Sequence, residues 1–143
     1  MVVRRHAVMA LEHVGSRDNA GKLQIMLKDE DDQVREYSAR ILGVFDAKEA
    51  AEHIVALLSD ANDCVRREAV TAVTKLSLQK HVDILANCLV DNDVQVRMGA
   101  ARAIGQSGEQ RFRPRLEAIA RDDPSDSVRD CARAALEDLA RKK

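Results

Sequence analysis

The chain has 143 residues and a net charge of −1, with 45% apolar and 33% charged residues. This balance excludes an intrinsically disordered chain, and no apolar run reaches the roughly 18 residues that a membrane helix needs. The near-neutral charge argues against a dedicated nucleic-acid binder, because such proteins attract phosphates with a basic surface. Aromatic residues make up only 2%, which argues against a strand-rich fold. The composition therefore favours helices packed through small residues.

The cysteines bear on the cellular compartment. Cys64, Cys88 and Cys131 are odd in number and far apart in the sequence, so we expect no disulfide framework. Residues 1–10 contain two arginines and a histidine but no apolar segment of the kind found in secretory signals. These features predict a reducing, cytoplasmic location.

The most informative feature is an internal repeat. The dipeptide Val-Arg begins at Val3, Val34, Val65, Val96 and Val128, at intervals of 31, 31, 31 and 32 residues. A fixed period between about 20 and 50 residues is typical of a solenoid. We therefore predict a single domain over residues 1–143, with about four and a half repeats at 1–30, 31–61, 62–92, 93–124 and 125–143.

Each repeat is predicted to contain two helices. In the first, here called helix A, small or apolar residues recur 0, 4, 7 and 8 positions after the valine, which places them on one helical face. In the second, helix B, apolar residues recur at positions 20, 23 and 24. Short breaks at 15–16, 46–47, 77–78 and 108–109 join A to B as an antiparallel hairpin. The fifth repeat has helix A only, so we predict nine helices.

The turns before helix A also recur. Three residues before each internal valine stand Asp31, Asn62, Asp93 and Ser125, which are preferred N-cap residues. Pro114 falls near the start of the fourth helix B, where its missing N–H costs little. Ser107 replaces an apolar residue, so the fourth helix A is expected to end early.

The period of 31 and the pattern Asp-x-Asp/Asn-x-x-Val-Arg-x-x-Ala-x-x-Ala-Leu resemble the HEAT-like repeats of the phycobilisome-lyase type. The resemblance covers nearly the whole chain. It implies an all-α fold, a right-handed α-solenoid (α-α superhelix) of HEAT-like helical hairpins. Proteins with this repeat include chromophore lyase subunits, deoxyhypusine hydroxylase and many scaffolds, so the resemblance is specific for the fold and leaves the function open.

Catalytic and metal-binding sets are not evident. His6, His13, His53 and His81 occupy unrelated positions in the repeat, and the sequence lacks the His-Glu pairs that hold iron in the related hydroxylases. Cys64 lies where a helix N-terminus can lower a thiol pKa, but no histidine is paired with it in the sequence. We therefore predict no enzyme activity, no metal and no cofactor.

The arginines that follow the valines form a second recurring set. From the second repeat on, each follows a turn aspartate by six residues, so its guanidinium can pair with a turn carboxylate and with carbonyl groups at helix ends. We expect a structural Asp–Arg ladder, and the alternative is a row of ligand-binding arginines. The ladder comprises Asp29, Arg35, Asp60, Arg66, Asp91, Arg97, Asp123 and Arg129.

The stacked B helices offer the predicted binding surface, since such helices form the concave wall of solenoids. Ile25, Val55 and Val90 are apolar where the pattern predicts exposure, as on a protein-binding face, although single exposed aliphatic residues are also normal. This B-helix wall comprises Gln24, Ile25, Lys28, Glu52, Val55, Ala56, Ser59, Asp83, Ala86, Asn87, Val90, Glu117, Ala118 and Arg121.

Three functions follow from these features. The first is a non-catalytic scaffold or adaptor that binds another protein, of unknown identity, on the B-helix wall. The second, implied by the resemblance alone, is a subunit or chaperone of a lyase that attaches a bilin or another prosthetic group. The third is weak nucleic-acid binding through the basic fourth helix B, with Arg111, Arg113, Arg115 and Arg121.

The first and last helices differ in the polarity expected of their outer faces. Five residues after the valine, the first four repeats have Val8, Ala39, Val70 and Ala101, but the fifth has Arg133. A polar outer face is expected of a terminal cap, which the last helix has and the first lacks. We expect the uncapped first helix to be covered, either by upstream repeats of a longer protein or by self-association.

Overall fold

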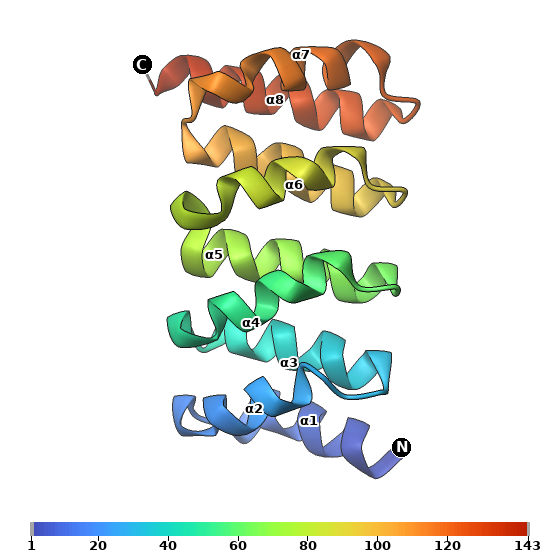
Figure 1. Ribbon diagram of the computed structural model, residues 1–143, viewed down its shortest axis with the longest axis vertical. Coiled ribbons are helices and arrows are strands. Elements are labelled where there is room, and N and C mark those ends of the chain that lie inside the picture. Colours follow the sequence, from blue (N-terminus) through green and yellow to red (C-terminus); the bar gives the residue numbers. More distant parts are fainter. Residues whose placement is uncertain (1, 143) are drawn as a thin grey trace. The chain divides into compact units, whose positions relative to one another are not determined.

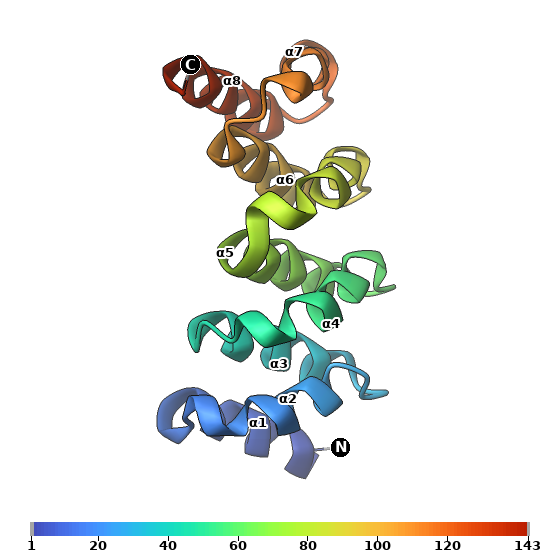
Figure 2. The same cartoon turned by 60° about the vertical axis from the view of Figure 1, so that its left-hand side comes forward.

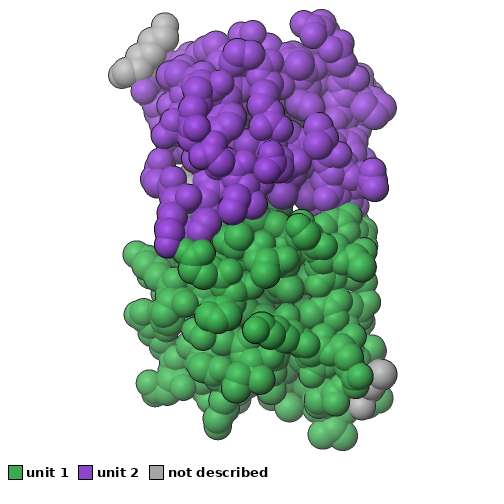
Figure 3. Space-filling model, viewed as in Figure 1, with its two compact units in different colours: residues 1–77 green, residues 78–143 purple. Residues whose placement is uncertain are grey.

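The computed structural model describes residues 2–142, except for the side chain of Leu78, and within these residues it contains helices and no strand. The predicted all-α solenoid of HEAT-like hairpins is confirmed. The chain forms two compact units, Met1–Ser77 and Leu78–Lys143 (Figure 3). No helix among the described residues is long and apolar enough to cross a membrane.

The first unit contains two complete hairpins and the start of a third. Its helices are α1 (Val2–Val14), α2 (Ala20–Met26), α3 (Asp32–Val44), α4 (Ala51–Val55) and the first part of α5 (Asp63–Asn87). Short 3₁₀ turns, Arg17–Asn19, Lys48–Ala50 and Ala56–Ser59, flank the B-type helices α2 and α4. The A-type helices α1 and α3 lie side by side, and α2 and α4 form a second layer (Figures 1 and 2).

Helix α3 follows the predicted burial pattern. Val34, Ser38, Ile41 and Leu42 are all fully buried, and the Ser38 hydroxyl donates to the Val34 carbonyl at 2.6 Å, which satisfies its polar group. Burying each large aliphatic side chain contributes roughly 1.5–3 kcal/mol. The four-residue stripe thus forms a buried face of α3, a helix that packs against α1 and α2.

Helix α1 departs from this pattern. Val3, Ala7 and Ala10 occupy the equivalent positions but are exposed, while Val8 is fully buried. The exposed stripe agrees with the expectation that the first helix lacks a cap, and α1 has its contacts with α3.

The predicted break at Ser77–Leu78 is not seen as an interruption of the helix. Helix α5 runs through it, so the third helices A and B are joined in one 25-residue element, and the boundary between the two units falls at the same position. At the breaks after α3 and α6, Asp46 and Gly108 adopt φ values of 51° and 77°, which end a right-handed helix. Ser77 and Leu78 supply no such residue.

The second unit contains the rest of α5, α6 (Val94–Ser107), α7 (Arg113–Asp122) and α8 (Asp126–Arg141), with 3₁₀ turns at Cys88–Val90 and Gln110–Phe112. Helix α8 packs against α6 and α7. The core includes Leu85, Ile104, Leu116 and Leu139. The expected early end of α6 is wrong, since the helix reaches Ser107 and the hydroxyl of this residue donates to the Ile104 carbonyl at 2.7 Å.

Three of the four predicted N-caps form. Asp31, Asn62 and Asp93 accept backbone N–H groups of the following first turns. Ser125 precedes α8 but makes no side-chain capping bond, which corrects that prediction. Its turn has one additional residue, and there the Asp123 carboxylate accepts the Ser125 N–H at 2.9 Å.

Candidate protein-binding surface

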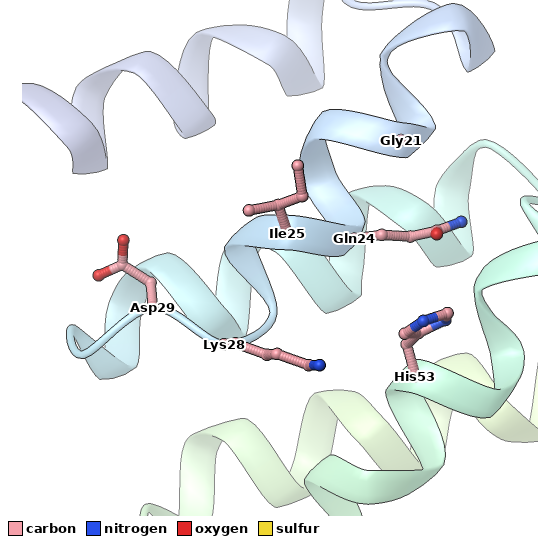
Figure 4. A pocket seen from close by; sticks show the side chains of 6 residues that line it. All are labelled: Gly21, Gln24, Ile25, Lys28, Asp29 and His53. Atoms are coloured by element: carbon pink, nitrogen blue, oxygen red, sulfur yellow. The ribbon is translucent and has the colours of Figure 1, made fainter.

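An open hollow of about 570 Å³ lies on the B-helix wall of the first unit, between α2 and α4 (Figure 4). Its lining residues are Gly21, Gln24, Ile25, Lys28, Asp29 and His53. Gln24, Ile25 and Lys28 belong to the predicted wall, so the structure brings these three residues together around one space. The sequence pattern did not place Gly21, Asp29 or His53 on this wall, although it assigned Asp29 to the Asp–Arg ladder.

The local sequence explains why the hollow is open. Ala20, Leu23 and Leu27 turn toward the core and are buried, so the remaining side of the α2 segment faces outward. On that side, a Cβ atom at Gly21 would have no heavy atom within 4 Å. A larger residue at this position would have filled part of the space.

The hollow combines an apolar group with cationic and polar ones. Ile25 is 77% exposed, and Lys28 and His53 are also exposed. Figure 4 shows Gln24, Lys28 and His53 bordering the same space. The Asp29 carboxylate already has a cationic neighbour, with Oδ2 lying 3.3 Å from Arg4 Nε. This arrangement can receive an apolar side chain beside an anionic group.

The described residues were also compared with the arrangement that a metal site needs. Among residues 2–142, no three His, Cys, Asp or Glu side chains come together as a set that could hold a metal ion. Cys64 is half-buried in the first turn of α5, and Cys88 is buried as expected.

The rest of the B-helix wall is mostly exposed. In the first unit Glu52, Ala56 and Ser59 are exposed and Val55 is half-buried. In the second unit Val90 is 73% exposed, and the other exposed wall residues are Asp83, Asn87, Glu117 and Arg121, with Ala118 half-buried.

The prediction that Ala86 lies exposed on the B-helix wall is wrong. Ala86 is fully buried, and Arg115 donates from Nη2 to its backbone carbonyl at 2.8 Å. Ile84 is 40% exposed instead, two residues earlier on α5. Repeat position alone does not reveal which side chains a neighbouring helix covers.

The arginines of the fourth helix B are engaged within the second unit. Arg111 lies 2.9 Å from Asp83, and this hydrogen-bonded pairing raises the pKa of Arg111 above its usual value. Arg121 lies 2.9 Å from Asp122, and Arg113 donates to the Gln110 side chain at 3.2 Å. These pairs reduce the positive charge offered to phosphates, so the geometry gives nucleic-acid binding no added support.

The Asp–Arg ladder can be followed in the first unit at Arg35. Its Nε and Nη2 donate to the Asp60 carboxylate of the next turn at 2.8 and 3.0 Å. Its Nη1 donates to the Asp29 and Glu30 carbonyls of its own turn at 2.8 and 3.1 Å. Arg66 likewise donates to the Asp60 carbonyl at 2.9 Å. One guanidinium thus connects two successive turns.

The second unit repeats this geometry at Arg97. Its Nε and Nη2 donate to Asp123 at 2.8 and 3.1 Å, and its Nη1 donates to the Asp91 carbonyl at 2.9 Å. Burial alone would raise the pKa of Asp123, but the hydrogen bond from Arg97, that from the Ser125 N–H and the nearby cations hold it below its usual value. Arg129 donates to the Asp123 carbonyl and pairs with Asp126.

Related contacts were missed at the start of the chain. Arg4 donates to Glu30 at 2.8 Å, and Arg5 donates to Asp31 at 2.7 Å. These ladder guanidinium groups serve contacts within the protein, which makes them unlike a row of free ligand-binding arginines.

Comparisons with solved structures agree with the fold. An engineered protein matches with a TM-score of 0.68 and 20% identity over 96% of this chain and 68% of that chain. The CpcE–CpcF complex of phycocyanin lyase from Nostoc sp. gives 0.62 and 21% over 85% of this chain and 65% of that chain. A designed armadillo repeat protein gives 0.64 and 23% over 94% and 75%. The chain thus spans about two thirds of the length of the first two.

A search of curated protein sequences finds no match. The family model for HEAT repeats matches residues 2–64 and 51–137, which together span most of the sequence. The periodic Val-Arg motif, the paired helices and this match lead to one assignment: the chain belongs to the HEAT-repeat family.

Proposed function

We propose that this chain is a non-catalytic scaffold that binds another protein along the B-helix wall, with the hollow around Ile25 as a main contact point. The observation that supports this most directly is the convergence of Gln24, Ile25 and Lys28 on that hollow. An aliphatic side chain that is 77% exposed beside an exposed cation has the mixed character of a protein-binding site. The cytoplasmic location stays part of this proposal, supported by the odd number and wide spacing of Cys64, Cys88 and Cys131.

The chemistry of the hollow defines the partner segment that fits it. An apolar side chain of the partner would contact Ile25 and occupy the space above Gly21. A partner carboxylate would lie toward Lys28, because the nearest acidic lining group, Asp29, already has Arg4 beside it. We therefore propose a peptide segment that presents an apolar residue next to an acidic one.

The test begins with capture of proteins from native lysate and identification of those retained. Binding of a purified partner is then measured by calorimetry for wild type and for Ile25→Glu and Lys28→Glu. We expect each substitution to weaken binding at least about tenfold, the equivalent of about 1.4 kcal/mol. Val44→Glu is the matched control, since Val44 is exposed on the A-type helix α3.

Equal binding by wild type and both wall variants would contradict the proposed site. All variants must first show the same helical circular dichroism and the same unfolding midpoint. Loss of binding by Val44→Glu alone would indicate that the partner binds the A helices and not the B-helix wall.

A second candidate is a subunit or chaperone of a bilin lyase. Its support is the resemblance of the repeats together with the likeness to the phycocyanin lyase complex, which at 21% identity concerns the fold. Absorbance spectra recorded with and without added bilin test it. A shifted bilin spectrum would favour this role, and an unchanged spectrum would count against it.

A further inference from the structure

Three polar side chains around the hollow at Ile25 have no partner among the described residues. Gln24 belongs to α2, Lys28 follows one turn later, and His53 lies across the space on α4 (Figure 4). None of the three makes a hydrogen bond or an ion pair with another described group. The hollow therefore offers an amide, an ammonium group and an imidazole to a partner.

The arginines of the first unit contrast with Lys28, because most of them are already paired. The Asp29 carboxylate that follows Lys28 lies 3.3 Å from Arg4, and so it does not neutralise the lysine. The positive charge of Lys28 is thus available to an anionic group from outside the protein. The arginines of this unit that pair with a carboxylate are Arg4, Arg5, Arg17, Arg35, Arg40 and Arg67.

His53 has charged neighbours but no carboxylate partner within the described part of the chain. Glu52 precedes it in α4. Of the two 3₁₀ turns that contact α4, Lys48–Ala50 contributes Lys48 and Glu49, and Ala56–Ser59 contains no titratable residue. Glu49 pairs with Arg17 at 3.1 Å. None of these carboxylates pairs with the imidazole, so the ring can accept an ionised group from a partner.

The chemistry of histidine adds a dependence on pH. Histidine is the side chain whose charge ordinarily changes between about pH 5 and 8. Aspartate and glutamate side chains of a partner stay mostly ionised over that range. A carboxylate beside Lys28 therefore gains a second cationic neighbour when the imidazole takes up a proton. The carboxylate also offsets the repulsion between the two cations, so binding and protonation favour each other.

We propose that His53 and Lys28 together hold the acidic residue of the partner segment, and that protonation of His53 strengthens this binding as the pH falls below about 7. The inference rests on the proposed function, which supplies the partner segment, and adds to it a second cationic contact and a pH dependence. Because both side chains are exposed, the gain in affinity is limited to about threefold to fivefold.

A short peptide of defined composition tests the pH dependence. The probe acetyl-Ser-Leu-Glu-Ser-amide contains one apolar and one acidic residue and no group that titrates in the histidine range. Its binding to the 143-residue chain is measured by NMR, from the backbone amide signals of Gln24 and Lys28, at about pH 7.5 and 5.5. We expect binding to be about threefold to fivefold tighter at the lower pH. The matched probe with Gln in place of Glu should bind equally at both.

Two substitutions of His53 separate its charge from its shape. His53→Gln keeps a polar side chain that cannot take up a proton, so its binding should be the same at both pH values. His53→Lys is cationic throughout and should bind at both as tightly as wild type does at the lower one. His13→Gln changes an exposed histidine of α1 and should keep the wild-type dependence. Circular dichroism checks that all variants keep their helices.

The coupling is reciprocal, which gives a second readout. Adding the Glu-containing peptide at about pH 6.5 should move the ring-proton signals of His53 toward their protonated positions and leave those of His13 unchanged. Equal binding by wild type at both pH values, or an unchanged dependence in His53→Gln, would overturn this inference and leave the proposed function standing. Unchanged signals of Gln24 and Lys28 at either pH would contradict the proposed site itself, and this inference with it.

Discussion

Helices α1 and α6 have the same repeat motif, but the motif residues differ in how far they are exposed to solvent. Val3, Ala7 and Ala10 of α1 are exposed, whereas Val96, Ala100 and Ala103 of α6 are fully buried.

The arginine after the valine is likewise more exposed in α1 than in α6. The Arg4 side chain is 45% exposed in its pair with Asp29, but Arg97 and Asp123 expose only 10% and 3% of their side chains. The motif thus specifies the helix and the arginine–carboxylate pairing. The surroundings of each helix determine how much each residue contributes to stability.

The largest expected effect follows from this difference in burial. Arg97→Ala removes the partner of a buried carboxylate, so we expect it to lower the free energy of unfolding by about 3–5 kcal/mol. Arg4→Ala should leave stability unchanged within error, because exposed ion pairs contribute little. Urea denaturation followed by circular dichroism measures both, and equal losses for the two variants would contradict the comparison.

The same buried pair predicts a pH dependence. Because the pKa of Asp123 is lower in the folded state than its usual value, the unfolded chain binds more protons in acid. Its stabilising contribution is therefore present above the usual aspartate pKa, and it is lost as the pH falls through the lowered value.

Denaturation at several pH values from neutral to about 3 measures this slope for wild type and Asp123→Asn. We expect a shallower acid slope for the variant. Burial raises the pKa of Glu36 and Glu68, so these two residues change the acid slope in the opposite direction to Asp123. Their effect is the same in wild type and in the variant, and it cancels when the two slopes are subtracted. Identical slopes would count against the role of Asp123.

Close packing of α6 gives the next prediction. A Cβ atom at Gly105 would lie 2.8 Å from the Ala135 Cα of α8, so Gly105→Ala forces the helices apart at a cost of about 1–3 kcal/mol. Gly43→Ala is the comparison variant, since its nearest contact, the Ala72 Cβ at 3.3 Å, requires a smaller shift. Thermal unfolding should show the larger loss for Gly105→Ala, and the reverse order would refute the packing argument.

The smallest expected change in stability is that of Gly21→Ala in the first repeat, and it is a gain where the preceding variants show losses. Gly21→Ala meets no atom within 4 Å and restricts the unfolded chain, so it should stabilise the protein by about 0.5–1 kcal/mol. Thermal unfolding measures this as well. A destabilised variant would mean that the backbone at Gly21 is not in the helical conformation described.

Much of the fold could be predicted from the sequence because it depends on local periodicity. The Val-Arg interval located the helices, and Asp31, Asn62 and Asp93 predicted helix starts. The pattern predicts a break at Ser77 and Leu78, but neither residue favours a left-handed turn, so the two helices join in α5.

The candidate site was predictable only in part. The position of Ile25 and Lys28 on the outward side of α2 follows from helical spacing. The hollow itself depends on the missing side chain of Gly21 and on His53 from the next repeat. The hydrogen bond from Arg115 to the Ala86 carbonyl joins residues 29 positions apart in the sequence. Such contacts between repeats leave no signal in a single repeat's pattern.

The arginines that connect successive turns have a consequence for how the protein unfolds. Arg35 binds the carbonyls of its own turn and the carboxylate of Asp60, 25 residues later. Opening either turn therefore breaks contacts in the other, which adds to the nearest-neighbour coupling between repeats. We expect amide hydrogen exchange in the turns on either side of Arg35 to proceed at matched rates, as a cooperative unit. Loosening one hairpin would then be transmitted along the array through guanidinium groups as well as through the apolar core.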